Sequence, residues 1–200
     1  MVATALLTTG ASLVTLSIVP YIKDIVRGKT KPRVISWAIW TLLLALTAVV
    51  SWQEGQMASV VLSAASSVAC FIVVLLAIRH TTIELNRLEH FTLIGALVGV
   101  GLWLMFDDPM LVLMTTITID AIAYLPTFAN GWNKPHHESL GMFVISAIGS
   151  GLVLIAAFLA HASSQGLVYP VYSVVFGSIM IGILLTRRPS VIRICESIDQ

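Results

Sequence analysis

Long apolar segments dominate this sequence and most restrict what it can fold into. Seven of them approach or reach the length that a helix needs to cross about 30 Å of hydrocarbon; they are residues 3–22, 34–52, 57–78, 91–106, 109–129, 139–160 and 167–186. Because they are continuously apolar rather than alternating, membrane β-strands are excluded. The chain is 58% hydrophobic and only 10% charged, which is too little charge to cover a water-soluble globule. The sequence therefore predicts an all-α integral membrane protein.

The positive charges predict how these helices cross the membrane. Threading the seven spans back and forth places all 11 Lys and Arg residues on one side, and cationic loops are retained in the cytoplasm. Glu54, Asp107 and Asp108 then fall in short outer loops. The first apolar segment has no basic residues before it, so it reads as a retained helix rather than a signal peptide. We expect a multi-pass protein of the plasma (inner) membrane, with its N-terminus outside and its C-terminus cytoplasmic.

The sequence also repeats a pattern of proline, polar loop, Lys-Pro, three residues and serine. The first copy has Pro20, Lys31, Pro32 and Ser36, and the second has Pro126, Lys134, Pro135 and Ser139. With three spans in each copy, the span 91–106 restores the orientation of the second copy and makes the two copies parallel. We therefore expect a first three-helix bundle in residues 1–80, a cytoplasmic loop and linker helix in 81–108, a second bundle in 109–188 and a cytoplasmic tail in 189–200.

This arrangement of three helices, one and three resembles the SWEET and PQ-loop superfamily of seven-helix transporters. The family's Pro-Gln dipeptides correspond to Pro20-Tyr21 and Pro126-Thr127 here, so the prolines match and the glutamines do not. The resemblance implies alternating access to a cavity between two bundles, with a sugar or similar small polar solute as cargo. It also implies that four prolines form a hinge and gate set, namely Pro20, Pro32, Pro126 and Pro135.

Asp120 is the charged residue that falls in the middle of a predicted span. A carboxylate at that depth costs about 2.5–3.5 kcal/mol on insertion scales unless it is protonated, paired or hydrated. Thr116 and Tyr124 lie one turn away on either side and form a polar stripe with it. One interpretation is a cavity wall that binds substrate, a proton or a cation. The other is a neutral carboxylic acid that bonds to a neighbouring group and helps the bundle to pack.

Three further residues complete the predicted substrate site. Trp37 could stack on a sugar or heterocycle, or could anchor the helix at the membrane interface. Ser63 and Tyr172 lie on polar faces of the third and seventh spans, which could line a pore or allow close packing. The segment 136–138, His-His-Glu, reads as a solvated loop rather than a metal site.

The predicted function is therefore transport of a small polar solute, with a membrane receptor or sorting protein, or a structural subunit, on the same scaffold as alternatives. The sequence contains no phosphate-binding, hydrolase or zinc motif, so we expect no enzyme activity, no cofactor, no metal and no nucleic-acid partner. The expected partners are the solute and the lipid bilayer. Coupling to a proton or cation and assembly as a homo-oligomer both stay open.

Overall fold

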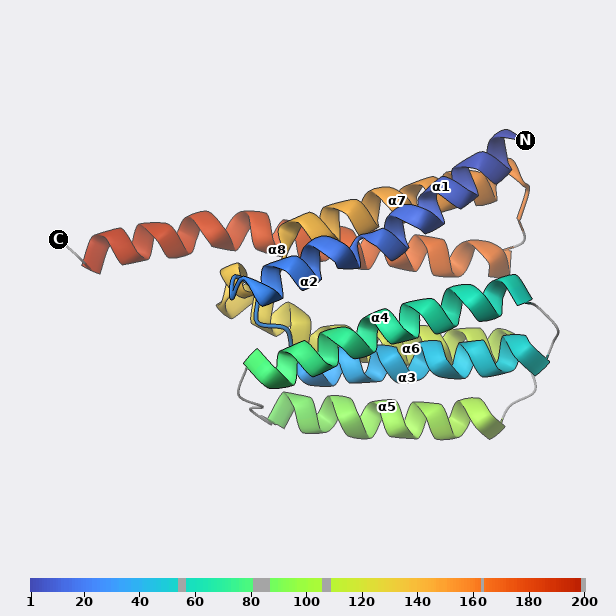
Figure 1. The fold of residues 1–200 in the computed structure, drawn as a ribbon, viewed down its shortest axis with the longest axis horizontal. Helices are drawn as coiled ribbons and strands as arrows, with labels where there is room; N and C mark the ends of the chain where they lie inside the picture. Colours follow the sequence, from blue (N-terminus) through green and yellow to red (C-terminus); the bar gives the residue numbers. More distant parts are fainter. Residues whose placement is uncertain (54–56, 81–86, 106–108, 163, 199–200) are drawn as a thin grey trace. The chain divides into compact units, whose positions relative to one another are not determined.

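The computed structural model describes residues 1–53, 57–80, 87–105, 109–162 and 164–198, whose regular structure is all helical (Figure 1). The elements are α1 (Val2–Leu16), α2 (Ile18–Val26), α3 (Val34–Gln53), α4 (Met57–His80), α5 (Arg87–Met105), α6 (Pro109–Asn133), the 3-10 helix η1 (Pro135–His137), α7 (Leu140–Leu159) and α8 (Ser164–Ile198). The prediction of an all-α protein is confirmed for these residues. Glu54, Asp107 and Asp108 lie outside them.

Within the described chain, three helical segments are long and apolar enough to cross a membrane. They are Val2–Val26, Leu140–Leu159 and Leu167–Arg188, and shorter apolar runs occupy Val34–Val49 and Ala64–Arg79. Large apolar side chains also cover outer faces of these helices; Val19 is 57% exposed and Ile155 50% exposed. Such surfaces are costly in water and stable in lipid. These features indicate a membrane protein.

Backbone contacts divide the chain into two compact units. Unit 1 comprises Met1–Thr30 and Phe128–Gln200, and unit 2 comprises Lys31–Thr127. Unit 1 therefore holds α1, α2, the end of α6, η1, α7 and α8, whereas unit 2 holds α3, α4, α5 and most of α6. Each unit combines segments from both sequence copies. That residues 1–80 and 109–188 act as bundles stays a prediction.

In unit 1, α1 lies along α7, and α7 also packs against α8. A Cβ atom on Gly10 would lie 2.6 Å from the carbonyl oxygen of Gly149, and one on Gly149 would lie 2.7 Å from that of Gly10. The two backbones therefore touch at this crossing, where any side chain would force them apart. Small residues at such crossings let membrane helices gain dispersion energy that lipid contacts alone do not provide.

The repeated prolines affect their helices differently. Pro20 has no N–H to donate to the carbonyl of Leu16, and the regular helix is interrupted for one residue at Ser17, between α1 and α2, although Ser17 keeps helical backbone angles. Pro126 lies inside α6, which continues through it to Asn133. The two repeated prolines therefore differ, since the first follows a one-residue interruption between two helices and the second lies inside an uninterrupted helix.

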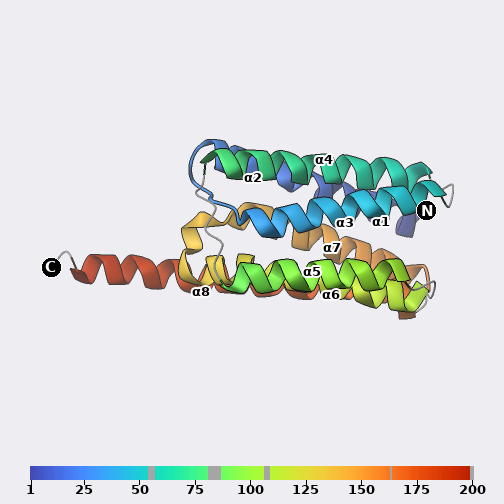
Figure 2. The same cartoon turned by 90° about the horizontal axis from the view of Figure 1, so that it is seen from below.

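In unit 2, α3 and α4 pack side by side (Figures 1 and 2). Ser67 on α4 donates its hydroxyl hydrogen to the carbonyl oxygen of Thr41 on α3, at 2.9 Å. A buried core then joins α3 to α5 and α6; its members are Ile39, Ala96, Ile119 and Ala123. Two of its members, Ile119 and Ala123, belong to the part of α6 that carries the predicted polar stripe.

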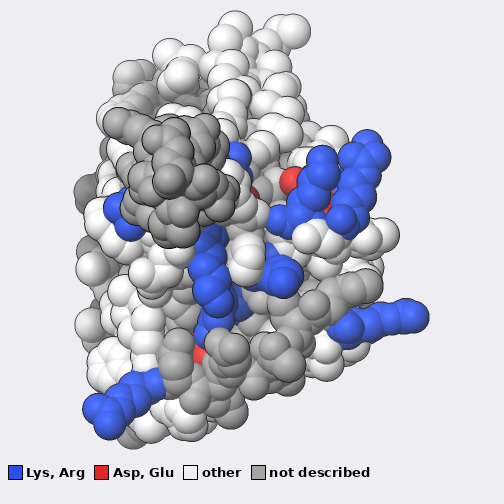
Figure 3. Space-filling view, turned by 90° about the vertical axis from the view of Figure 1, so that its left-hand side faces the viewer, with Lys and Arg blue, Asp and Glu red and all other residues white. Residues whose placement is uncertain are grey.

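Within each unit, the Lys and Arg side chains lie at one end of the helices (Figure 3). In unit 1 they lie in the last turn of α2 or after it, follow α6 and end the apolar part of α8; in unit 2 they precede α3, end α4 and begin α5. The described ones are Lys23, Arg27, Lys29, Lys134, Arg187 and Arg188 in unit 1, and Lys31, Arg33, Arg79 and Arg87 in unit 2. This distribution agrees, unit by unit, with the charge asymmetry seen in the sequence.

Candidate functional site

The predicted polar stripe lies on α6 within unit 2. Thr116, Asp120 and Tyr124 are all half-buried, and each makes at least one polar, ring or electrostatic interaction in the structure. Because Asp120 lies one helical turn before Tyr124, whose ring contacts Trp40 of α3, the stripe lies on the face of α6 that meets α3.

An aromatic cluster from α3 adjoins this stripe. The ring centroids of Trp40 and Tyr124 are 5.0 Å apart, and those of Trp37 and Trp40 are 5.1 Å apart, both in edge-to-face geometry. The Nε1 atom of Trp40 is buried, and the described residues offer it no hydrogen-bond partner. A buried donor of this kind needs a polar group to bond with. The structure thus brings four of the six predicted substrate residues, Thr116, Asp120, Tyr124 and Trp37, into one unit.

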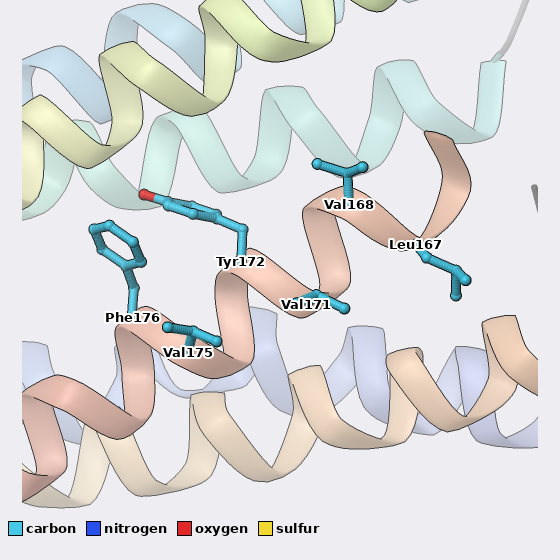
Figure 4. A pocket seen from close by; sticks show the side chains of 6 residues that line it. All are labelled: Leu167, Val168, Val171, Tyr172, Val175 and Phe176. Atoms are coloured by element: carbon cyan, nitrogen blue, oxygen red, sulfur yellow. The ribbon is translucent and has the colours of Figure 1, made fainter. Parts of the chain in front are cut away.

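The other two predicted substrate residues lie elsewhere. The side chain of Ser63, on α4, is outside the described residues. Tyr172 lies on α8 in unit 1, with its ring 4.3 Å from that of Phe176. It borders a shallow apolar hollow of about 450 Å³ whose lining residues all belong to α8 (Figure 4). An apolar hollow on a single helix offers no set of converging polar groups for a polar solute.

The four predicted hinge prolines differ in position. Pro32 is buried just before α3 begins, and Pro135 is buried as the first residue of η1. Pro20 and Pro126 lie on helices, as described above. Two of the four therefore shape the loops between helices, and two act on the helices themselves.

The sequence interpretation missed a buried polar group in unit 1. Reading residues 136–138 as a solvated loop is wrong for Glu138, which is only 1% exposed, although His136 is exposed as expected. The Glu138 carboxyl group accepts hydrogen bonds from the Tyr21 hydroxyl at 3.0 Å and from the Asn130 amide at 2.6 Å. These two donors offset the cost of burying the carboxyl group.

Two further contacts complete this group. Ser139 donates its hydroxyl hydrogen to Asp24 at 2.6 Å. Arg188 donates from Nη2 to the carbonyl oxygen of Glu138 at 2.7 Å and from Nε to that of Pro135 at 3.2 Å. We call residues 134–139 loop 2. The loop-2 cluster is the group of side chains that hold this loop, namely Tyr21, Asp24, Asn130, Glu138, Ser139 and Arg188. A signal in the sequence was available, because Asp24 and Asn130 each follow a repeated proline by four residues.

Unit 2 has a smaller counterpart. Thr127 on α6 donates its hydroxyl hydrogen to Ser36 at 3.0 Å, and both residues are buried. Arg33, just before α3, donates from Nε to the buried Glu89 of α5 at 2.9 Å and forms an ion pair with it. We call residues 31–36 loop 1, and we call Arg33, Ser36, Glu89 and Thr127 the loop-1 cluster.

The two clusters share one arrangement. Ser36 and Ser139 occupy the same position in the repeat, and each bonds to the proline-bearing helix of the other copy. Ser36 of the first copy meets Thr127 of the second, and Ser139 of the second copy meets Asp24 of the first. The repeats therefore exchange partners at the basic end of each unit.

The described residues of these sites interact through hydrogen bonds, an ion pair and ring contacts. Across the described residues, no three His, Cys, Asp or Glu side chains come together as a metal site would require. No family model matches the chain, and neither a curated protein nor a solved structure matches it. The likeness to SWEET and PQ-loop proteins therefore stays a proposal.

Proposed function

We propose that this chain is a seven-helix membrane carrier of the SWEET and PQ-loop type, which moves a small polar solute such as a sugar by alternating access. The observation that supports this most is the half-buried Asp120, which lies one helical turn from the contact between Trp40 and Tyr124. Ionisable groups inside a membrane bundle are costly and usually serve a pathway or a binding site. Packing alone would be served more cheaply by an apolar residue.

The side chains on α3 and α6 suit a polar solute with flat apolar faces. Asp120 and Thr116 supply oxygen atoms that can exchange hydrogen bonds with hydroxyl groups, and Trp40 supplies a buried N–H donor. Trp40 and Tyr124 supply ring surface. A few converging polar groups among aromatic side chains are typical of small-molecule sites. Asp120 could also carry a coupling proton or cation.

The two polar clusters fit the role of a cytoplasmic gate. Each joins a proline-bearing helix of one copy to the Lys-Pro loop of the other. If residues 1–80 and 109–188 move as bodies, opening the cytoplasmic side breaks both clusters together. Hydrogen bonds of this kind contribute about 0.5–1.5 kcal/mol each, so they can open and close reversibly.

The first experiment finds a solute and then tests the stripe with it. The purified chain is screened for thermal stabilisation by sugars, amino acids, nucleosides and vitamins, since a ligand at about one hundred times its Kd stabilises by about 2.7 kcal/mol. The hit is then used as radiolabelled solute in counterflow into liposomes. The variants are Asp120→Asn and Thr116→Ala, with Thr118→Ala as a matched control. Thr118 is exposed, and its hydroxyl bonds to its own helix at the Met114 carbonyl, at 2.8 Å.

We expect counterflow by the wild type, a loss of about tenfold or more in Asp120→Asn, a smaller loss in Thr116→Ala and none in Thr118→Ala. Equal losses in the two threonine variants would show that the stripe is not the site. Stabilisation by a solute without any counterflow would identify a receptor and contradict transport. A stability hit that ignores Asp120 would make this carboxyl group a packing element.

A further inference from the structure

Two consecutive arginines end the apolar part of α8, and they are used in different ways. Arg188 turns toward loop 2 and donates to the carbonyl oxygens of Pro135 and Glu138. Arg187 lies over the indole of Trp132, with its Cζ atom 4.6 Å from the ring centroid, and its Nε donates to the Trp132 carbonyl at 3.1 Å. Arg188 thus fixes loop 2 to α8, while Arg187 makes its hydrogen bond and its ring contact with Trp132 among the described residues.

The two terminal amino groups of Arg187 remain available. No described residue bonds to them or pairs with their charge. Lys134 follows Trp132 by two residues, is exposed and likewise has no described partner. The carboxyl groups of the loop-2 cluster are already engaged, because Glu138 bonds to Tyr21 and Asn130, and Asp24 bonds to Ser139. Among the described residues, neither Arg187 nor Lys134 therefore has a counter-ion, and Arg187 lies over the exposed indole of Trp132.

The position of this group selects its partner. Trp132 is 51% exposed at the end of α6, and Arg187 lies at the end of the apolar segment Leu167–Arg188. Tryptophan side chains concentrate at the level of lipid head groups, where the ring meets acyl chains and the N–H meets water. A guanidinium fixed over such a ring presents a planar pair of donors that match two phosphate oxygens.

We infer that Arg187, Trp132 and Lys134 form a binding site for the phosphate head group of an anionic phospholipid. The terminal amino groups of Arg187 bind the phosphate, the Lys134 ammonium adds a second positive charge, and the Trp132 ring contacts the glycerol and upper acyl chain. This site depends on a membrane location for the chain and is independent of any transported solute.

The site is tested by titrating the purified, delipidated full-length chain with dioleoyl phosphatidylglycerol and counting bound lipid by native mass spectrometry. Dioleoyl phosphatidylcholine is the zwitterionic comparison. The variants are Arg187→Gln and Lys134→Gln, and the control is Arg27→Gln. Arg27 is an exposed cation that follows α2 in the same unit and has no aromatic partner among the described residues.

We expect the wild type to prefer the anionic lipid. Arg187→Gln and Lys134→Gln should each weaken its binding about fivefold, the share of one cation at an anionic surface, while Arg27→Gln changes it less than about twofold. If Arg27→Gln has as large an effect as Arg187→Gln, the lipid responds to total charge and the site does not exist. Equal binding of the two lipids, or complete displacement by millimolar inorganic phosphate, would also overturn it. Because Lys134 is exposed, Lys134→Gln keeps the test decisive even if Arg187→Gln fails to fold.

Discussion

The two Lys-Pro loops begin with the same two residues, and each ends on a buried serine. The side chains between these residues differ in chemistry and in what they contact. The first loop, residues 31–36, enters α3 directly at Val34, and its third residue, Arg33, pairs with Glu89. The second loop, residues 134–139, first forms η1 and buries the carboxyl group of Glu138. Ile35 and Glu138 are equivalent in the repeat, but Ile35 packs against an apolar core.

The difference shows what a short repeat specifies. The shared Lys-Pro and serine residues shape a turn that brings the serine inside. What is buried between them depends on the partner helices, which offer Tyr21 and Asn130 to loop 2 and an apolar core to loop 1. A carboxyl group is stable only where donors meet it, so the same position can hold Ile in one copy and Glu in the other.

The largest effect is expected from Glu138→Ile, which gives loop 2 the residue of loop 1. The buried hydroxyl of Tyr21 and amide of Asn130 would lose their acceptor. At about 1–3 kcal/mol for each unsatisfied group, the free energy of unfolding should fall by about 3 kcal/mol. Denaturant unfolding of the detergent-solubilised chain measures it. Glu138→Gln retains an acceptor oxygen and should lose less; wild-type stability in Glu138→Ile would mean that the cluster does not hold loop 2.

Arg188→Gln should come next. It removes two charge-assisted hydrogen bonds to loop carbonyls, but Arg188 is only half-buried and water replaces part of each bond, so we expect a loss of about 2 kcal/mol in the same unfolding assay. Arg187→Gln is the matched control, since it removes the same charge one residue earlier but only one backbone bond. If both variants lose equal stability, the loss comes from removing a positive charge at this end of unit 1 and not from breaking the hydrogen bonds of Arg188 to loop 2.

In loop 1, Arg33→Gln should have a smaller effect. It leaves the Glu89 carboxyl group without its cation, but the Arg33 side chain is 19% exposed, so water screens part of the interaction. We expect a loss of about 1.5 kcal/mol, the low end for a hydrogen bond to a charged group. Arg87→Gln changes an exposed cation at the start of the same α5 helix and should be neutral. If Arg33→Gln leaves the free energy of unfolding unchanged, the ion pair between Arg33 and Glu89 does not stabilise loop 1.

The smallest effects are expected at the repeated serines. Ser139→Ala removes a bond to the Asp24 carboxyl group and should cost about 1 kcal/mol, whereas Ser36→Ala removes a bond between two hydroxyls and should cost about 0.5 kcal/mol. The double variant should equal the sum, because the two serines belong to different units. A larger loss of stability in Ser36→Ala than in Ser139→Ala would contradict the expectation that the loop-2 cluster stabilises the protein more than the loop-1 cluster.

The sequence predicted part of the candidate site because some of its information is local. Thr116, Asp120 and Tyr124 share one helix, so their spacing places them on one face without any knowledge of the fold. The contact between Trp40 and Tyr124 joins α3 to α6, and no sequence pattern within either helix predicts that these two residues meet. The loop-2 cluster was missed for a similar reason, since Glu138 in a short polar segment looks solvated until Tyr21 is placed beside it.

By itself, the sequence determined the helical class, the apolar segments, the placement of Lys and Arg near the ends of these segments and the position of the repeat. These properties follow from hydrophobicity and turn chemistry summed over about 20 neighbouring residues. Only the tertiary structure decided that Glu138 is buried and that each repeated serine bonds to the other copy. Tyr21 and Glu138 are 117 residues apart in the chain, and the burial of a polar atom depends on which distant partner reaches it.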